Sequence, residues 1–353
     1  MQGLIKILCA LSASIMISGC KMAGTVIYDL ETGKQVTFIK NASKRHYVHL
    51  FVQKNLNTPS FWMSLPYPTE KVHMNFCEYD FDGTALQQFD PHLERYFSDD
   101  ISISPNHERL VYFNRESVPA GGAHQWKQIN NLMTKRLGDA NSTIILENAG
   151  RVTLHKQSIF WLTNDEAITA MRLDDRETFF ILKLNASADI THKLPCRKIT
   201  WASGNAILPS PDGRHLLVNF DDGKKIGIVD IATMTFVKEV ELFAPDERVF
   251  PQTDFTWINN HEFVTYFYEI DKILQYNIET SQLTSINVPF PADKYRVIGA
   301  TERFFILRAR GKTMWEDIWS FDRETSKMKK ICSDAVGPVY KLSETRILIQ
   351  NAR

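Results

Sequence analysis

A segment that can form three antiparallel strands joined by tight turns, residues 208–242, sets the pattern of the whole chain. Pro-Asp-Gly at 211–213 and Asp-Asp-Gly at 221–223 are turn sequences, because Pro presets φ and Gly accepts conformations that a Cβ disfavours. The stretches between the turns are rich in residues suited to a pleated sheet. With residues 199–202 as a first strand, the segment predicts a four-stranded antiparallel unit. One such sheet cannot bury both of its faces, so we expect copies of it.

The hairpin at residues 226–240 of this unit recurs along the chain. Each copy has an apolar strand that ends in Asp or Asn, a small polar turn and a second strand. The seven copies span residues 26–39, 76–89, 128–146, 178–193, 226–240, 273–288 and 315–331. Their spacing of about 45 to 55 residues is typical of propeller blades. The sequence therefore predicts an all-β chain that folds as a seven-bladed β-propeller.

The two ends of the chain complete each other. The hairpin at residues 26–39 has no first half before it, and residues 339–350 match a first half with nothing after it. We expect strands from both termini to share one blade, which closes the ring and removes exposed sheet edges. Residues 45–65 are the least regular segment. If they held a further unit, the ring would have eight blades.

The first 20 residues predict an export signal. A lone Lys precedes an apolar stretch too short to span a bilayer, and small residues then precede Cys20. The Ile-Ser-Gly-Cys sequence that ends at Cys20 resembles the lipobox of bacterial lipoproteins. The resemblance implies a signal peptide at residues 1–19 and acyl chains such as palmitate on Cys20. The propeller domain predicted from the repeat then spans residues 20–353. Because Lys21 follows the Cys, it also implies an outer-membrane location with the body facing the periplasm.

Composition agrees with a globular body that binds no nucleic acid. The hydrophobic fraction is 44%, which is enough for a packed core, and 41 Lys and Arg residues balance 41 Asp and Glu residues. The chain therefore has no global basic field of the kind that nucleic-acid binding requires. Apart from the two N-terminal cysteines, Cys77, Cys196 and Cys332 remain. This odd number permits at most one internal disulfide in an oxidising compartment.

Two segments carry a family resemblance. Ser-Pro-Asp-Gly-Arg-x-Leu-Leu-Val at residues 210–218 and Ser-Pro-Asn-x-x-Arg-Leu-Val-Tyr at residues 104–112 resemble repeats of the Tol-system periplasmic propeller and its tryptophan–aspartate-repeat relatives. The resemblance implies a propeller over nearly the whole mature chain. The sequence departs from the family in that no Trp-Asp dipeptide closes a blade.

No linear motif predicts catalysis, a cofactor or a metal site. The nucleophile elbow, the paired-histidine zinc motif, the Walker loop and the dinucleotide-binding glycine motif are all missing. Polar residues do recur at one blade position: Asp29, Asp80, Asp230, Asn277 and Asp322. At a repeated position, we interpret them as side chains that cap hairpin turns rather than as a ring of functional acids.

The loops between second and third strands predict a partner-binding face, because aromatic and Arg residues are favoured at protein interfaces. Residues 114–127 form a long Gly-containing loop in this interpretation, residues 61–68 are aromatic and Pro-rich, and the other loops are charged. The candidate binding residues are Trp62, Tyr67, Arg115, Trp126, Arg172, Asp175, Asp221, Arg308 and Arg310.

The leading hypothesis is a scaffold module that binds an envelope protein or a cell-wall component, touches the membrane only through its lipid anchor and catalyses nothing. An alternative is a propeller enzyme of the hydrolase, lyase or lactonase type. Its acids and His would come from different blades to the propeller axis and leave no linear motif. A third alternative is a carbohydrate-binding surface module, which the aromatic segment at residues 61–67 would serve.

Overall fold

The computed structural model describes most of the chain after residue 23 as strands and turns. The described residues are 24–40, 52–54, 59–65, 75–89, 101–119, 126–151, 158–173, 178–197, 199, 206–220, 224–242, 254–266, 272–287, 295–310, 316–335 and 339–352. Within these ranges no helix occurs, and hence none that could cross a membrane. The expected signal peptide and Cys20 lie outside the described residues.

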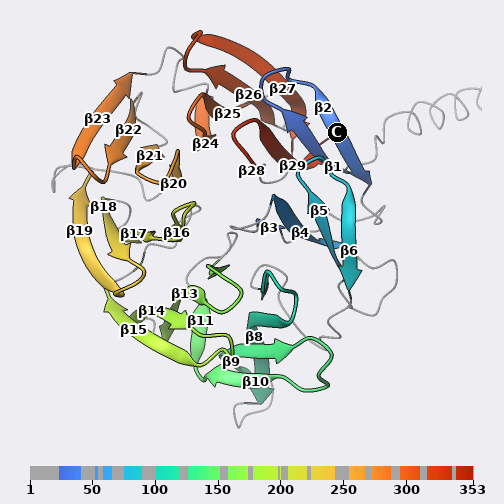
Figure 1. The fold of residues 1–353 in the computed structure, drawn as a ribbon, viewed down its shortest axis with the longest axis vertical. Helices are drawn as coiled ribbons and strands as arrows, with labels where there is room; N and C mark the ends of the chain where they lie inside the picture. Colours follow the sequence, from blue (N-terminus) through green and yellow to red (C-terminus); the bar gives the residue numbers. More distant parts are fainter. Residues whose placement is uncertain are drawn as a thin grey trace, which may run out of the picture.

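The strands form seven antiparallel sheets, arranged as blades around one axis (Figure 1). Blade 1 contains β3 (Val52–Lys54), β4 (Ser60–Leu65), β5 (Asn75–Asp80) and β6 (Ala85–Phe89). Blade 2 contains β7 (Ile101–Ile103), β8 (Arg109–Pro119), β9 (Trp126–Arg136) and β10 (Thr143–Leu146). Blade 3 contains β11 (Ala149–Arg151), β12 (Ile159–Trp161), β13 (Ala167–Leu173), β14 (Phe179–Leu184) and β15 (Ile190–Cys196). Its β11 and β12 pair with opposite ends of β13.

The remaining blades repeat the same four-stranded order. Blade 4 contains β16 (Ile207–Pro209), β17 (His215–Phe220), β18 (Lys225–Asp230) and β19 (Thr235–Glu241). Blade 5 contains β20 (Asp254–Trp257), β21 (Glu262–Tyr266), β22 (Lys272–Asn277) and β23 (Gln282–Asn287). Blade 6 contains β24 (Tyr295–Ala300), β25 (Phe304–Arg310), β26 (Glu316–Asp322) and β27 (Lys327–Ala335).

The closing blade joins the two ends of the chain, as the sequence predicts. Its first two strands are β28 (Val339–Lys341) and β29 (Arg346–Ala352), and its outer two are β1 (Gly24–Asp29) and β2 (Gln35–Lys40). Antiparallel pairing of β1 with β29 closes the ring. The ring has seven blades rather than eight, because β3 and β4, which both lie in the irregular segment at residues 45–65, supply the first half of blade 1.

The core lies between the blades. The described residues form seven buried apolar clusters, and each fills the junction of two neighbouring blades. Strand alternation explains why one strand serves two junctions. In β29, Ile347 and Ile349 pack toward blade 6, whereas Leu348 packs toward blade 1. Inner strands therefore read as continuous apolar runs, since both of their faces are buried.

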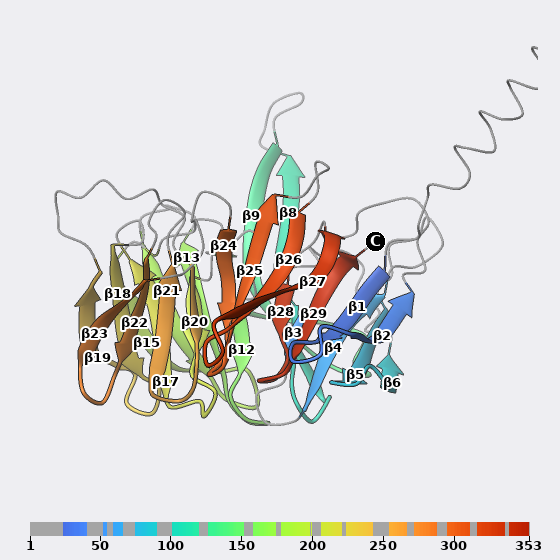
Figure 2. The ribbon, with the colours of Figure 1, turned by 90° about the horizontal axis from the view of Figure 1, so that it is seen from above.

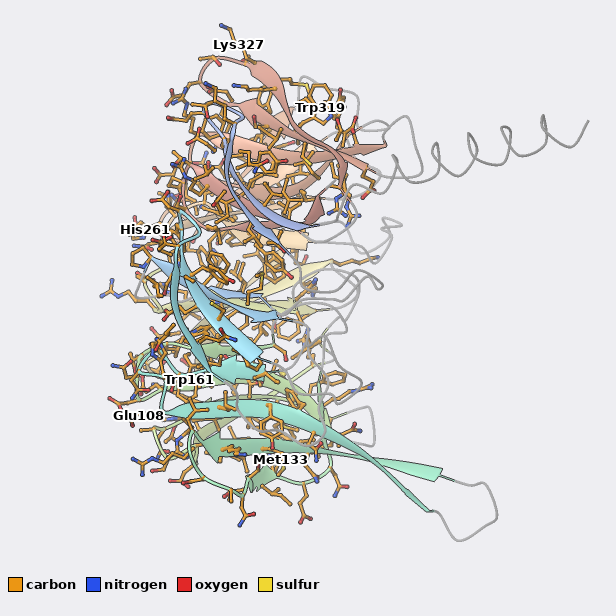
Figure 3. The ribbon with its side chains drawn as sticks, turned by 90° about the vertical axis from the view of Figure 1, so that its right-hand side faces the viewer. Glu108, Met133, Trp161, His261, Trp319 and Lys327 are labelled. Atoms are coloured by element: carbon orange, nitrogen blue, oxygen red, sulfur yellow. The ribbon has the colours of Figure 1, made fainter. Side chains whose placement is uncertain are left out.

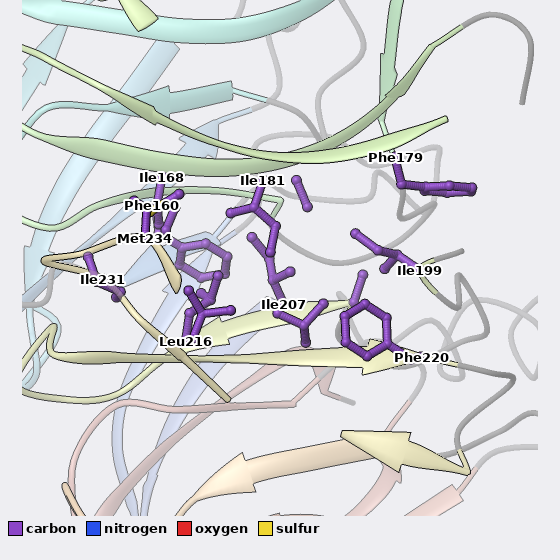
Figure 4. Packing of buried hydrophobic residues seen from close by; sticks show 14 of the residues in the cluster. Phe160, Ile168, Phe179, Ile181, Ile199, Ile207, Leu216, Phe220, Ile231 and Met234 are labelled. Carbon is purple, nitrogen blue, oxygen red and sulfur yellow. The ribbon is translucent and has the colours of Figure 1, made fainter. Parts of the chain in front are cut away.

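The junction of blades 3 and 4 shows this packing in detail (Figure 4). Phe160, Ile168 and Ile181 of blade 3 lie against Ile207 and Leu216 of blade 4, and all five side chains are buried. Burial of apolar surface stabilises by roughly 25 cal/mol for each Å² removed from water. The blades are thus held in the ring mainly by side-chain packing, while hydrogen bonds join strands within each blade.

Candidate functional site: the hairpin-bearing face

Short turns occupy one end of the ring. They connect first to second strands and third to fourth strands, and contacts between neighbouring blades bring them together. Arg109 donates from Nη1 to the carbonyl oxygen of Ser187 at 3.4 Å, and Glu302 donates its backbone N–H to Oε2 of Glu344 at 2.8 Å. We call this end the turn face. The opposite end, where second strands end and third strands begin, is the hairpin-bearing face.

The recurring Asp and Asn residues lie on the turn face and cap its turns. Asp29 accepts hydrogen bonds from N and Oγ1 of Thr32 at 2.6 and 2.8 Å. Asp230 binds Thr233 in the same way. Asp80, Asn277 and Asp322 each accept from backbone N–H groups of the following turn. The structural interpretation of these residues is therefore confirmed.

A long hairpin dominates the opposite face (Figures 2 and 3). Strands β8 and β9 pair continuously from Arg109↔Arg136 to Pro119↔Trp126. Neighbouring β7 pairs only with residues 110–112, and β10 only with residues 132–134. Beyond those residues the two strands rise from the ring as a two-stranded ribbon. We call residues 114–119 and 126–131 the projecting hairpin.

The projecting hairpin corrects one sequence prediction. Residues 114–127 were expected to form a loop because they contain Pro and two adjacent Gly residues. Instead Arg115 lies in β8 opposite Asn130, and Trp126 begins β9 opposite Pro119. Residues 114–119 and 126–131 are mostly polar, so the alternation of apolar and polar residues that identifies a strand was weak here.

Trp62 does not belong to a binding face. It lies in β4, its side chain is fully buried, and it packs with Phe76 and Ile101 in the junction of blades 1 and 2. Its neighbour Phe61 is equally buried and faces the closing blade. The aromatic run was interpreted as a surface because it precedes Pro66 and Pro68 in a segment that the sequence assigns to a loop between strands. Burial of both blade faces also produces such a run.

The other candidate residues are only partly placed. Arg172 and Arg308 are half-buried at the hairpin-bearing ends of β13 and β25, and Arg310 is the last residue of β25. Arg308 forms an ion pair with Glu316 of the same blade, with Nη1 at 3.0 Å from Oε2. Topology thus brings these Arg residues and Arg115 to one end of the ring. The remaining candidates, Tyr67, Asp175 and Asp221, lie outside the described residues.

A polar cluster that sequence reasoning missed lies between blades 1 and 2. Glu78 is buried, and its carboxylate accepts hydrogen bonds from Ser60 Oγ at 2.6 Å and Gln87 Nε2 at 2.8 Å. His107, on the turn between β7 and β8, places Nε2 3.4 Å from Glu78 Oε2 and its ring edge-on to Trp62. Burial lowers the pKa of His107 and outweighs the opposing attraction of Glu78. The residues are distant in sequence, so no linear signal could have found them.

Among the residues that the structure describes, four buried oxygen atoms near the hairpin-bearing ends of inner strands have no hydrogen-bond partner. They are Ser102 Oγ in β7, Ser158 Oγ, just before β12, Asn219 Oδ1 in β17 and Thr265 Oγ1 in β21. Each of these residues is almost completely buried. An unpaired buried polar atom costs roughly 1–3 kcal/mol, so native proteins keep few of them without a reason such as a bound water or ligand.

Neither a metal centre nor a disulfide forms within the part of the chain that the structure describes. No group of His, Cys, Asp and Glu residues there could hold a metal ion. Cys77, Cys196 and Cys332 are free thiols, and burial raises the pKa of Cys196 to about 12. Burial also raises the pKa of Cys77, so Cys77 and Cys196 are poor nucleophiles, because the thiolate is the reactive form.

Comparisons with known proteins support the fold. No protein-family model matches the sequence, and no curated protein matches it. The chain is similar in structure to the periplasmic gluconolactonase of Pseudomonas aeruginosa, with a TM-score of 0.50, 9% identity, and coverage of 94% of this chain and 98% of that one.

Two structures of puromycin-hydrolysing enzymes are similar as well. A puromycin hydrolase mutant complexed with PGG gives a TM-score of 0.52 and 11% identity over 88% of this chain and 52% of that one. The puromycin-hydrolysing peptidase of Mycobacterium tuberculosis gives 0.50 and 13% over 85% and 48%. This chain thus spans about half the length of each. At such low identity, these likenesses show a propeller and no activity.

Proposed function

We propose that this chain is an outer-membrane lipoprotein, anchored through Cys20, whose periplasm-facing propeller binds an envelope component through the hairpin-bearing face. The observation that carries the proposal is the projecting hairpin. An isolated two-stranded hairpin is marginally stable in water, so a ribbon that leaves its blade gains little for the fold. Its edges carry backbone groups that can pair with an added strand. A partner that adds to the ribbon would supply the missing stabilisation.

Sequence features support the same proposal. The projecting hairpin contains Trp126 and Arg115, which are residue types enriched among interface hot spots. Arg172 and Arg308 lie at the same end of the ring. The carbohydrate-binding alternative has lost its main support, because Phe61 and Trp62 are buried.

The test is in-cell crosslinking of the full lipoprotein, followed by pull-down and mass spectrometry. The test variant replaces residues 115–130 with Asn-Gly, a favoured two-residue turn that joins the cross-strand partners Asn114 and Asn131. A control variant, Glu324→Ala, changes an exposed side chain on the turn face. We expect the control to capture the wild-type partner and the hairpin variant to lose it with its melting temperature unchanged. Equal capture by both variants would refute the assigned surface.

The buried unpaired oxygens favour a second candidate, a propeller enzyme with a small-molecule site beneath this face. Ser158, Asn219 and Thr265 would then line or approach the site. Turnover of lactone, ester or peptide substrates by the purified protein, reduced by Asn219→Ala but not by removal of the projecting hairpin, would establish this candidate. If the protein shows no turnover but still captures its partner, the enzyme candidate is refuted and the binding function is supported.

A further inference from the structure

We infer that the hairpin-bearing face is held against the membrane that carries the anchor, and that its partner is a protein embedded in that membrane. The inference rests on the anchoring through Cys20 proposed above. It joins two observations: the position of the first residue of β1 in the ring, and the length of the projecting hairpin.

The chain enters the ring at the hairpin-bearing face. Gly24, the first residue of β1, pairs with Ala352 at the end of β29. From there β1 runs to Asp29, which caps a turn on the turn face. The third strand of every blade runs in this direction, as β9 does from Trp126. Figure 2 accordingly shows the C-terminus, beside Gly24, on the side of the ring toward which β8 and β9 project.

The connection to the anchor is short. Only Lys21, Met22 and Ala23 separate Cys20 from Gly24. Four Cα–Cα steps in an extended chain span at most about 14 Å. Acyl chains on Cys20 would therefore hold Gly24, at the part of the hairpin-bearing face that belongs to the closing blade, within that distance of the lipid surface.

The projecting hairpin is longer than this connection. Its arm at residues 114–119 rises by about 3.3 Å per residue, which gives roughly 20 Å beyond the paired body of blade 2. Because the projecting hairpin is longer than the connection between Cys20 and Gly24, it reaches the lipid headgroups when the hairpin-bearing face lies parallel to the membrane. Its strands include Trp126, Val118 and Ile129, and Trp is a residue type enriched at membrane–water interfaces.

The narrow gap determines the class of partner. A 100-residue domain has a radius of gyration of about 13 Å, which for a compact sphere means a diameter of roughly 34 Å, more than twice the reach of the tether. A separate globular protein does not fit between this face and the lipid beside the anchor. The body of a membrane-embedded protein lies within the bilayer, so only its loops or strand edges enter the gap. Such strand edges can pair with the edge of the projecting hairpin.

The first experiment measures orientation in protein-free vesicles of phosphatidylethanolamine and phosphatidylglycerol with quencher-labelled headgroups. The lipidated protein carries a fluorophore on one new thiol, Ser117→Cys in the projecting hairpin or Ala140→Cys. Ala140 is exposed on the turn between β9 and β10, at the other end of the same blade. The protein without a new thiol gives the background from Cys196 and the two buried cysteines. We expect several-fold stronger quenching of the Ser117→Cys label.

A spacer variant provides the control. About 15 Gly and Ser residues inserted between Ala23 and Gly24 give a mean reach near 21 Å and a much longer maximum, so the difference between labels should largely disappear. Equal quenching of both labels without the spacer, in protein that floats with the vesicles, overturns the orientation but leaves the anchoring intact. Protein that fails to float, like a Cys20→Ser control, overturns the proposed anchoring and the inference together.

A second experiment tests the partner class. A photo-crosslinking residue at position 117 or 140 is introduced into the full lipoprotein in cells. The inference expects position 117 to capture a protein that stays in the membrane fraction after urea and salt washes, and position 140 not to capture it. Capture at position 117 of a protein released by those washes overturns the inference while supporting the binding function.

Discussion

Gly227 offers a quantitative test of how blades 3 and 4 pack. It lies in β18, where a Cβ would lie 2.9 Å from Cε1 of Phe236 and closer still to Cε2 of Phe220. The two rings cover the glycine from either side, with their centroids 5.5 Å apart. Phe220 is buried against Ile199 and Ile207, so its ring cannot move away freely (Figure 4).

The expected cost follows from two opposing effects. Overpacking a well-filled core costs about 1–3 kcal/mol. Ala in place of Gly in a strand recovers about 0.5–1 kcal/mol of backbone entropy. We therefore predict that Gly227→Ala lowers the free energy of unfolding by about 1–2 kcal/mol. In a chain of this size, the entropy of unfolding is about 0.7 kcal/mol/K, so the melting temperature falls by about 1–3 °C.

Urea denaturation monitored by circular dichroism measures the effect, and a double-mutant cycle identifies its cause. Phe220→Leu removes the obstructing ring, so the double variant should lose at least about 0.5 kcal/mol less than the sum of the single variants. Gly299→Ala is the matched control, because the nearest atom to its Cβ would be the terminal Cδ1 of Ile306 at 3.1 Å, a milder contact than at Gly227. If Gly227→Ala were as stable as wild type, or if the two effects were additive, the packing argument would be refuted.

Three further predictions concern electrostatics. Arg346→Ala removes the ion pair with Asp29 that joins β29 to β1. In urea titrations it should lower the free energy of unfolding by about 1 kcal/mol. In an Asp29→Asn background the same change should have a much smaller effect. Burial lowers the pKa of His107, so the folded state favours neutral imidazole. Stability should therefore decline as the pH falls below about 6.5. In profiles of melting temperature against pH, His107→Gln should make that decline less steep. Hydrogen bonding from Arg303 lowers the pKa of Asp322 to about 2, so this pair stabilises above about pH 4 and loses its effect toward pH 2. Arg303→Ala should therefore move the acid-unfolding midpoint to higher pH, and an unchanged midpoint would show that the pair contributes nothing.

Local chemistry explains why the ring could be predicted from the sequence. Turn formation depends on a few adjacent residues, such as Asp230 and Thr233, which hydrogen-bond within the same turn. Strands with both faces buried read as apolar runs. Because the repeat is local, the unfinished units at the two ends were enough to predict the closing blade.

The candidate face was predicted less well because it depends on contacts between segments distant in sequence. Trp62 looks like part of an aromatic surface until blade 2 covers it with Ile101 and Leu110. Glu78 and His107 come from different blades, so their pairing appears only when the junction forms.

The sequence by itself determined the blade repeat and the turn caps, since each depends on neighbours along the chain or on strand alternation. Only the tertiary structure decided that β8 and β9 continue as a ribbon beyond their blade, and that Gly24 enters the ring at the same end. Both facts depend on how strand register and blade order combine around a closed ring. A linear pattern cannot express which end of that ring a strand begins at.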